Sequence, residues 1–457
     1  MSIKVTAVFD IGRTNKKFFL FDSDFQEVYR EYSRFDEITD EDGYPTENLN
    51  ALENWAKAVF DKMLNNPEFE IIALNFSCYG ASLVHLDENG NVLAPLYNYM
   101  KPLKDEIYDS FYDTYGPESE LSRVTGSPKL GMLNTGMHLY WMKHTKPAVY
   151  DKIKYSLHLP QYLSYLFTGV PVSEFTSIGC HTLLWDFEKK DYHAWVYQEG
   201  INEKLPPIAS SRKTIPVTYN GKSIQMGAGI HDSSSALLPY IRSISKPFVL
   251  VSTGTWSISI NPFNKGMLSA EDIENDSLFN MRIDGSPVRV SRLFLGNEYK
   301  LQVKALSKYF KVPEDSHKKV KFNQDTFFEV NKDFVPMFKW SSIASETMPE
   351  KTKITYTKFE HAYHQLMLEL VLLQEKSIRS AIGNEKIERL YVDGGFSDNE
   401  VYIQMLSHYL RNMKLSTTDS SLGSALGAAI VISDVTLEPK FLRKNYSLKK
   451  HRPLTLK

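Results

Sequence analysis

The stretch that decides the fold is VTAVFDIGRTNKKFFLFD, residues 5–22. Its two apolar runs flank a polar turn around Gly12, a pattern that predicts two strands joined as a hairpin. Helix-like and strand-like segments alternate after it, with a helix near Asn50–Leu64 and strands at Ile71–Phe76 and Leu83–Leu86. Because helices and strands interleave rather than segregate, the sequence predicts an α/β fold.

A second hairpin pattern, PFVLVSTGTWSISI, occupies residues 247–260. Its turn is Thr253-Gly254-Thr255, and its second arm alternates apolar residues with serines. Gly254 follows Gly12 by about half the chain, so each hairpin could begin one copy of a duplicated domain. We therefore predict two domains, residues 1–243 and 244–438.

The second half predicts further elements. Apolar spacing favours a helix over Phe359–Ser377 with Gly383 as a C-cap, and a strand at residues 387–393. A last helix within residues 420–432 carries Gly423 and Gly427 four positions apart, which would let it approach a neighbour closely. Residues 439–457 are rich in Lys and Arg and contain no acid, which predicts a solvated basic tail.

Composition narrows the class of protein. The 457 residues include 53 Lys and Arg against 55 Asp and Glu, a net charge of −2 that gives no support for nucleic-acid binding. Cys78 and Cys180 form neither a disulfide framework nor a metal-ligand spacing. No window is apolar enough for a membrane span and no secretory segment is recognised, so we expect a cytoplasmic protein without a membrane partner. The sequence is compatible with a homodimer.

The first turn has the residue types that phosphoryl transfer uses. A glycine lets the backbone approach a phosphate and aim N–H groups at it, while hydroxyl and ammonium groups add donors. We assign ATP binding to Gly12, Thr14, Asn15 and Lys17. Asp10, at the end of the strand, is the candidate ligand for Mg²⁺. The alternative is an ordinary hairpin with a polar turn.

Two further glycine-containing turns have residue types that suit the binding of ATP. Thr253, Gly254 and Thr255 offer hydroxyls and unobstructed backbone, and we assign all three to ATP. Gly394 and Gly395 follow a predicted strand, where a glycine pair permits flat packing against a base or ribose, and Asn399 starts the next helix. Each turn taken alone could be purely structural.

Asp232 is the candidate catalytic base. It lies in GAGIHDSSSA, residues 227–236, at the start of a predicted helix. One alternative is that it caps the helix, since Asp at a helix start is common. A helix N-terminus favours the ionised carboxylate, so we expect a weak base. The neighbouring His231 could orient the hydroxyls of a substrate or be structural.

These four segments, in this order, resemble the FGGY family of carbohydrate kinases, within the actin-like ATPase superfamily. DGGFSDNEVYIQML, residues 393–406, is similar to the family's adenosine motif, with Asn399 and Gln404 in place. The segment around Asp232 is similar to the one that bears the family's catalytic aspartate. The resemblance implies two ribonuclease-H-like domains around a cleft, with the sugar bound largely by the first domain and Mg·ATP by the second.

The chain departs from the family pattern at two places. Arg13 stands in the phosphate turn where D-x-G-T or D-x-G-A is usual, and Asn98 stands where a carboxylate is often found. Tyr79 and Gly80 lie where the resemblance implies a sugar-side aromatic residue and glycine, so we assign both to the substrate together with Asn98, His231 and Asp232.

The turn STGTW is more similar to the kinases of 6-deoxy ketohexoses than to glycerol kinases. The resemblance therefore implies ATP-dependent phosphorylation of a ketose such as L-rhamnulose or L-fuculose. A kinase of another pentulose or polyol, xylulose-like or glycerol-like, is the alternative within the family. Outside it stand a catalytically inactive sugar or nucleotide sensor, an actin-type assembling protein and a phosphohydrolase.

Overall fold

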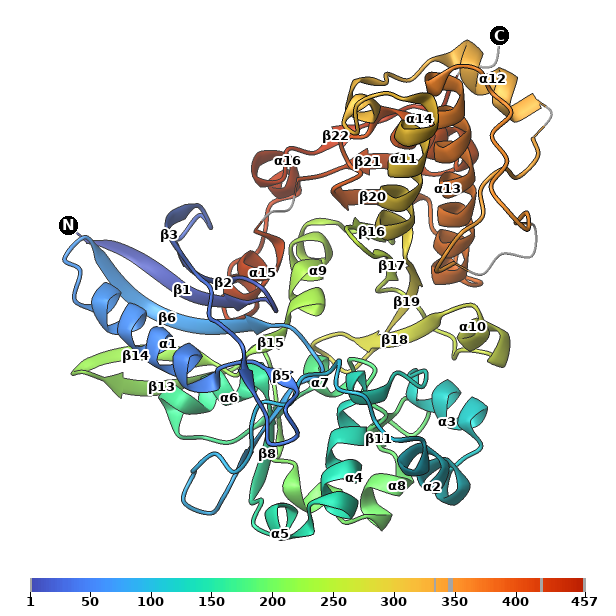
Figure 1. Cartoon of the computed structure of the whole chain (residues 1–457). Coiled ribbons are helices and arrows are strands. Elements are labelled where there is room, and N and C mark those ends of the chain that lie inside the picture. The colour runs from blue at the N-terminus through green and yellow to red at the C-terminus, as the bar shows by residue number, and fades with distance from the viewer. Residues whose placement is uncertain (1, 333, 344–347, 420–421, 455–457) are drawn as a thin grey trace.

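The structure is a computed structural model that describes residues 2–332, 334–343, 348–419 and 422–454. It has two lobes, one built mainly from the N-terminal half of the chain and one from the C-terminal half (Figure 1). Residues 420–421 of the predicted last helix and 455–457 of the predicted tail lie outside the described residues. None of the described helices is long and apolar enough to cross a membrane.

A mixed sheet forms the centre of the first lobe. Its strands are β1 (Ile3–Ile11), β2 (Lys16–Phe21), β3 (Glu27–Ser33), β6 (Phe69–Cys78), β13 (Thr214–Tyr219), β14 (Lys222–Gly227) and β15 (Ile230–His231). Strand β1 is antiparallel to β2 and parallel to β6, and β15 is parallel to β6. The predicted hairpin is β1-β2 and the strand predicted at Ile71–Phe76 is β6, so both predictions are confirmed. The strand predicted at Leu83–Leu86 is β7, with the same bounds.

Helices cover both faces of this sheet: α1 (Leu49–Leu64) and α6 (Leu159–Thr168) on one, α9 (Asp232–Ser243) and α15 (Gly423–Val431) on the other. Phe9 of β1 packs in the cluster that contains α1 and α6, whereas Val8 packs in the cluster that contains α9 and α15. A strand buried on both faces reads as a continuous apolar run, which is why residues 5–9 show little alternation.

The second sheet repeats the first. Its strands are β16 (Val249–Thr253), β17 (Ser257–Asn261), β18 (Ser277–Met281), β19 (Pro287–Leu293), β20 (Arg389–Gly394), β21 (Lys414–Thr417) and β22 (Lys449–Lys450). The order β19-β17-β16-β20-β21 matches β3-β2-β1-β6-β15, with a hairpin, a third antiparallel strand and two parallel strands. The α/β fold with two ribonuclease-H-like domains is confirmed.

Four helices cover one face of the second sheet: α11 (Leu295–Phe310), α12 (Gln324–Lys332), α13 (Phe359–Ile382) and α14 (Glu400–Tyr409). The helix predicted from Phe359 is α13, which extends five residues beyond the predicted Ser377. Gly383 follows as its C-cap with φ of +59°, as predicted, because glycine adopts positive φ at little cost.

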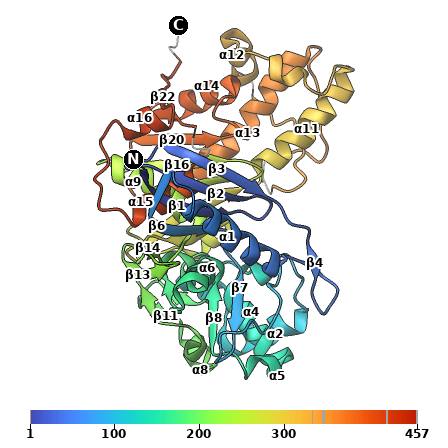
Figure 2. The same ribbon diagram turned by 90° about the vertical axis from the view of Figure 1, so that its left-hand side faces the viewer.

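Helices α9 and α15 lie between the two sheets (Figures 1 and 2). A Cβ on Gly427 would lie 1.9 Å from the backbone oxygen of Ser235, so only glycine permits this approach. Helix α15 also contacts the first sheet, where Asn75 Nδ2 donates to Ala428 O at 2.8 Å. The close packing predicted for this glycine helix is confirmed, although its partners include the first lobe.

The segment between β7 and β13 builds the rest of the first lobe. Besides α6, its α-helices are α2 (Asp105–Tyr115), α3 (Glu118–Thr125), α4 (Thr135–Thr145), α5 (Pro147–Tyr150), α7 (Phe175–Ile178) and α8 (Ala194–Gln198). Strand β18 of the second lobe lies against this segment, and Phe279 N donates to Gly126 O at 2.9 Å. Phe187 and Phe279 belong to one apolar cluster shared by both lobes, so the lobes meet there as well as at α9 and α15.

The basic segment after Pro439 differs from the expected solvated tail. It forms α16 (Phe441–Asn445) and pairs β22 with β21. Phe441, Leu442 and Tyr446 are buried in the cluster around α9 and α15. Interspersed aromatic and aliphatic residues therefore anchor the segment through apolar burial, which its charge composition did not indicate.

Candidate active site

The β1-β2 turn holds the first group of predicted phosphate contacts. Gly12 N donates to Asn15 O at 3.0 Å, which closes the turn. Thr14 is exposed at its tip, whereas Asn15 Oδ1 accepts a hydrogen bond from Arg34 Nε at 2.7 Å. The contact with Arg34 fixes the Asn15 side chain through its acceptor oxygen, and phosphate binding by Thr14 and Asn15 stays a prediction.

The two lysines after the turn differ. Lys17 Nζ lies 3.4 Å from Asp10 Oδ2, its neighbour across the hairpin. Lys16 is buried, donates to two carbonyl oxygens of the turn at 3.0 and 3.2 Å, and pairs with Glu47. Lys16 thus holds the shape of the turn, while the partly exposed Lys17 presents its charge beside Asp10.

Asp10 ends β1 where the lobes meet. Ser424 Oγ of α15 donates to its Oδ1 at 2.8 Å. Burial raises the pKa of Asp10, and the charge of Asp232 adds to this, whereas Lys17 and Ser424 oppose it. The described residues include no group of three or more His, Cys, Asp or Glu that could hold a metal. A single carboxylate nevertheless fits Mg²⁺, which usually binds one or two protein carboxylates together with substrate phosphates.

Arg13 is held by two carboxylates. Its guanidinium pairs with Glu37 and lies 3.7 Å from Glu47, and its Cζ is 6.0 Å from the centre of the Tyr99 ring. These contacts place the cation beside the turn rather than leaving it in solvent.

Asp232 is the first residue of α9, and His231 occupies the N-cap position. The capping alternative is therefore wrong. Ser233 N and Ser233 Oγ donate to Asp232 Oδ1 at 2.5 and 3.2 Å, and His231 Nε2 lies 3.2 Å from the same oxygen. Within the described parts of the chain, no hydrogen bond engages Oδ2, and 34% of the side chain is accessible to solvent. One carboxylate oxygen is fixed and the other is available.

Enclosure by the surrounding protein raises the pKa of Asp232 to about 6, against the smaller opposing effect of its bonds to Ser233. The prediction of a weak base underestimated the pKa of Asp232, because desolvation raises this pKa more than the helix N-terminus lowers it. A carboxylate of this pKa is ionised at neutral pH and is a better proton acceptor than an ordinary aspartate.

His231 and Gly80 belong to the same corner of the site. Burial lowers the pKa of His231 to about 4, so its imidazole is neutral at physiological pH. A Cβ on Gly80 would lie 3.0 Å from Cys180 Sγ and 3.1 Å from His231 Nε2. Gly80 therefore provides the space in which the thiol and the imidazole meet.

Tyr79 and Asn98 have structural partners. Tyr79 is buried and its hydroxyl donates to Glu47. Asn98 Nδ2 donates to Pro45 O and its Oδ1 accepts from Met100 N, both at 2.9 Å. Both side chains support the wall of the site, so direct contact with a sugar stays a prediction for each.

Tyr99 is the aromatic residue that the sequence reasoning missed. Its ring is partly exposed and packs edge-on against Tyr79, with 6.2 Å between the ring centres. Burial raises the pKa of Tyr99, and the charge of Asp232 adds to that rise, which places the phenol within electrostatic range of the base. No local pattern pointed to Tyr99, because it lies in a turn and packs in a different apolar cluster from Tyr97, two residues before it.

In the second lobe the two remaining glycine turns pack against each other. Gly395 N donates to Thr253 O at 2.7 Å, and a Cβ on Gly394, whose φ is +81°, would lie 2.0 Å from that oxygen. The hydroxyl of Thr253 is used within this contact, because it donates to Asp393 O and accepts from Phe396 N. Gly254, Thr255 and Gly395 remain exposed.

Gly296, near the start of α11, completes this wall and was not predicted. Its N–H donates to Thr255 O at 3.1 Å, and a Cβ there would lie 2.0 Å from Gly254 O. The signal in the sequence was a glycine at the junction of a strand and a helix. Asn399 caps α14 by accepting from Tyr402 N, and its Nδ2 donates to Tyr363 at 3.0 Å.

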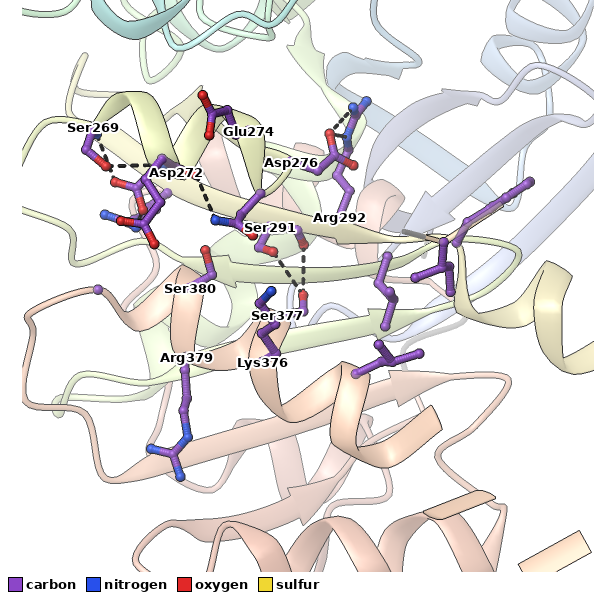
Figure 3. A pocket seen from close by; sticks show the side chains of 18 of the residues that line it. Ser269, Asp272, Glu274, Asp276, Ser291, Arg292, Lys376, Ser377, Arg379 and Ser380 are labelled. Atoms are coloured by element: carbon purple, nitrogen blue, oxygen red, sulfur yellow. Dashed lines mark hydrogen bonds and ion pairs between the residues drawn. The ribbon is translucent and has the colours of Figure 1, made fainter. Parts of the chain in front are cut away.

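A cavity of about 760 Å³ lies elsewhere in the second lobe, between α10 (Ala270–Glu274), β19 and α13 (Figure 3). Its charged side chains are largely paired, Arg289 with Asp272 and Arg292 with Asp276. None of the predicted ATP-binding residues lines this cavity, although Trp256, which follows Thr255, does. Asp232 does not line it either. We therefore assign the chemistry to the junction around Asp10 and Asp232.

Two family models match the chain over most of its length. The model of the N-terminal domain of the FGGY family of carbohydrate kinases matches residues 5–238, and the model of the C-terminal domain of FGGY carbohydrate kinases matches residues 245–440. A rhamnulokinase of Oceanobacillus iheyensis is 25% identical over 198 residues, which are 42% of this chain and 41% of the relative. The matched segments span about half the length of the curated relatives.

Two solved structures share the fold over nearly the whole chain. A carbohydrate kinase from Novosphingobium aromaticivorans is 24% identical with a TM-score of 0.80, and covers 100% of this chain and 95% of its own. A ligand-bound xylulose kinase from Lactobacillus acidophilus is 14% identical with a TM-score of 0.76, and covers 99% and 94%. The two matched domain models cover most of the sequence, so the chain belongs to the FGGY family of carbohydrate kinases.

Proposed function

We propose that the protein transfers the terminal phosphoryl group of ATP to a hydroxyl of a small sugar. The observation that carries the proposal is Asp232, whose Oδ1 accepts two hydrogen bonds from Ser233 and lies 3.2 Å from His231 Nε2, while Oδ2 is left for a substrate. Its raised pKa suits a general base at neutral pH. The matched family supports the class of reaction.

Asp232 Oδ2 would accept the proton of the sugar hydroxyl as the oxygen attacks phosphorus. Phosphoryl transfer has a loose transition state, so most of the catalysis comes from positioning and charge neutralisation. The hydroxyls of Thr14 and Thr255 and the charge of Lys17 would bind the phosphates. The N–H groups of Gly12, Gly254 and Gly395 already donate to backbone oxygens of the turns, so these glycines would act by letting the phosphates come close to the backbone. Mg²⁺, carried with ATP, would be held by Asp10 and would neutralise phosphate charge.

For the sugar we propose a ketose, with L-rhamnulose or L-fuculose first. The support is the similarity to a rhamnulokinase and the aromatic face of Tyr99 beside the base, since aromatic rings suit the apolar face of a sugar or a terminal methyl group. A pentulose such as xylulose is the second candidate, because a xylulose kinase shares the fold across the whole chain.

The test is release of ADP from Mg·ATP with a panel of ketoses and polyols, and without sugar. A kinase releases ADP only with its sugar, a phosphohydrolase releases it without one, and a sensor releases none. Asp232→Asn should lower kcat at least about 100-fold with ATP affinity nearly unchanged. Near-normal turnover in that variant would remove the base assignment.

A further inference from the structure

A line of polar side chains runs from Asp232 into the first lobe. His231 Nε2 lies 3.2 Å from Asp232 Oδ1 and 3.2 Å from Cys180 Sγ. Cys180 Sγ lies 3.4 Å from His181 Nε2, and His181 Nδ1 lies 3.2 Å from Leu133 O. The thiol therefore bridges two imidazoles, only one of which touches the candidate base.

The direction of every hydrogen bond in this line is determined from its far end. Leu133 O can only accept, so His181 Nδ1 carries the proton that it donates. His181 is neutral, since burial lowers its pKa, and its Nε2 is then a lone pair. Cys180 must donate its S–H to that lone pair, which leaves the sulfur as an acceptor toward His231.

The near end gives the same answer independently. His231 Nε2 lies 3.2 Å from the Asp232 carboxylate, which would repel a lone pair on that nitrogen and favours a proton there. His231 Nδ1 is buried and has no partner within the described residues. An unpaired buried N–H costs about 1–3 kcal/mol, so the tautomer with its proton on Nε2 is favoured. Both ends agree only if Cys180 donates to His181 and accepts from His231.

We propose that Cys180 and His181 are positioning residues for the catalytic base: the His231 Nε2–H donates to Cys180 Sγ, and this contact holds the imidazole with Nε2 at 3.2 Å from Asp232 Oδ1. This inference rests on the proposed role of Asp232. With Oδ1 held by Ser233 and flanked by the His231 imidazole, the carboxylate is kept from rotating, which leaves Oδ2 for the hydroxyl. Because His231 Nε2 already bears a proton, the proton taken from the sugar stays on Asp232.

The backbone around the thiol is arranged for this contact. His181 has a φ of +43°, in the left-handed region that a residue other than glycine adopts at a cost. Gly80 leaves the space that a Cβ would take from Cys180 and His231. His231 N also donates to Thr176 Oγ1 at 3.0 Å, so its backbone is held as well. A residue with positive φ and a glycine that leaves room for both side chains lie on either side of one thiol, which supports a role beyond packing.

The direct test is the tautomer of each imidazole, read from the side-chain ¹⁵N shifts of the ¹⁵N-histidine-labelled full-length protein at pH 7. The two resonances are assigned by comparison with His231→Gln and His181→Gln variants. We expect His231 protonated at Nε2 and His181 at Nδ1. The same tautomer in both, or a His231 protonated at Nδ1, would overturn the proposal. This readout does not depend on turnover, so it separates failure of the inference from failure of the proposed kinase activity.

The second test compares Cys180→Ala with Cys180→Ser. Alanine removes the donor and the acceptor, so kcat should fall about fivefold with the KM for ATP unchanged, and the His231 signal should shift toward a mixture of tautomers. Serine keeps both functions and should restore kcat to within about twofold of the parent. Cys78→Ala, at the other buried cysteine, should leave the His231 tautomer unaltered. Equal kcat in the alanine and serine variants, with both folded by circular dichroism, would refute a positioning role.

Discussion

Ser424 Oγ donates a hydrogen bond of 2.8 Å to Asp10 Oδ1 across a sequence separation of 414 residues. The helix that carries Ser424 packs against α9, where Ser235 Oγ donates to Ser424 O at 2.6 Å. Asp232 is the first residue of α9. One pair of helices therefore supports both carboxylates of the candidate site, so a shift between these helices would change the site at both acids.

The pH dependence of activity should report Asp232. Its pKa is raised to about 6, and only the ionised form accepts a proton, so kcat/KM for the sugar should be constant above about pH 7 and fall about tenfold per pH unit below 6. Asp10, whose pKa is also raised, and the neutral His231 face this carboxylate. The measurement is a pH series at saturating Mg·ATP. A rate independent of pH down to 4.5 would contradict the base assignment.

Gly80→Ala should disturb the base without touching the nucleotide. The added Cβ would lie 3.0 Å from Cys180 Sγ and 3.1 Å from His231 Nε2, so the imidazole must move. We expect kcat to fall about fivefold or more while ATP affinity, measured by calorimetry, is retained. Gly266→Ala is the matched control, because nothing lies within 4 Å of a Cβ at that position. Equal kinetics in the two variants would show that Gly80 is not needed for spacing.

The two adjacent glycines of the second lobe should respond differently to substitution. Gly394→Ala puts a Cβ 2.0 Å from Thr253 O at a φ of +81°, so it should destabilise the fold by about 1–3 kcal/mol. Gly395→Val has its nearest contact at 3.9 Å and should fold, but its branched side chain would cover an exposed backbone face. We expect Gly395→Val to weaken ATP binding more than sugar binding. Titration of both ligands decides this, and a larger loss of sugar affinity would place the nucleotide elsewhere.

Gly427→Ala should loosen the helix pair between the lobes. A Cβ there would lie 1.9 Å from the backbone oxygen of Ser235, which can move only with α9. Overpacking of this kind costs about 1–3 kcal/mol, so urea unfolding should show a lower midpoint. Because α9 begins at Asp232, kcat should fall as well. An unchanged midpoint with unchanged kcat would show that the two helices tolerate separation.

Local chemistry made much of the architecture predictable. The apolar runs on either side of Gly12 and Gly254 predict strands, and each glycine predicts the turn between them. Both signals are local, because strand periodicity and the wide backbone conformational range of glycine involve only a few neighbouring residues. The order of these hairpins predicted the repeated sheet, and the start of α13 and its C-cap at Gly383 followed from spacing alone. Asp10 and Asp232 were also recognised from the sequence, since a carboxylate after a buried strand or at a helix start is a local pattern.

The tertiary structure decided which side chains are available. Asn98 is engaged by Pro45, Asn15 by Arg34, and Tyr99 lies near the base, and these partners are too far apart in sequence for a local rule to pair them. The bond from Met100 N to Asn98 Oδ1, by contrast, spans two residues and is local. The raised pKa of Asp232 arises from enclosure by segments distant in the chain, which reversed the expectation from its helix N-terminus alone. The contact of the Cys180 thiol with His231 likewise depends on long-range packing, which brings Cys180 beside Gly80. Sequence patterns encode what neighbouring residues do to the backbone, whereas hydrogen-bond partners and desolvation depend on the whole fold.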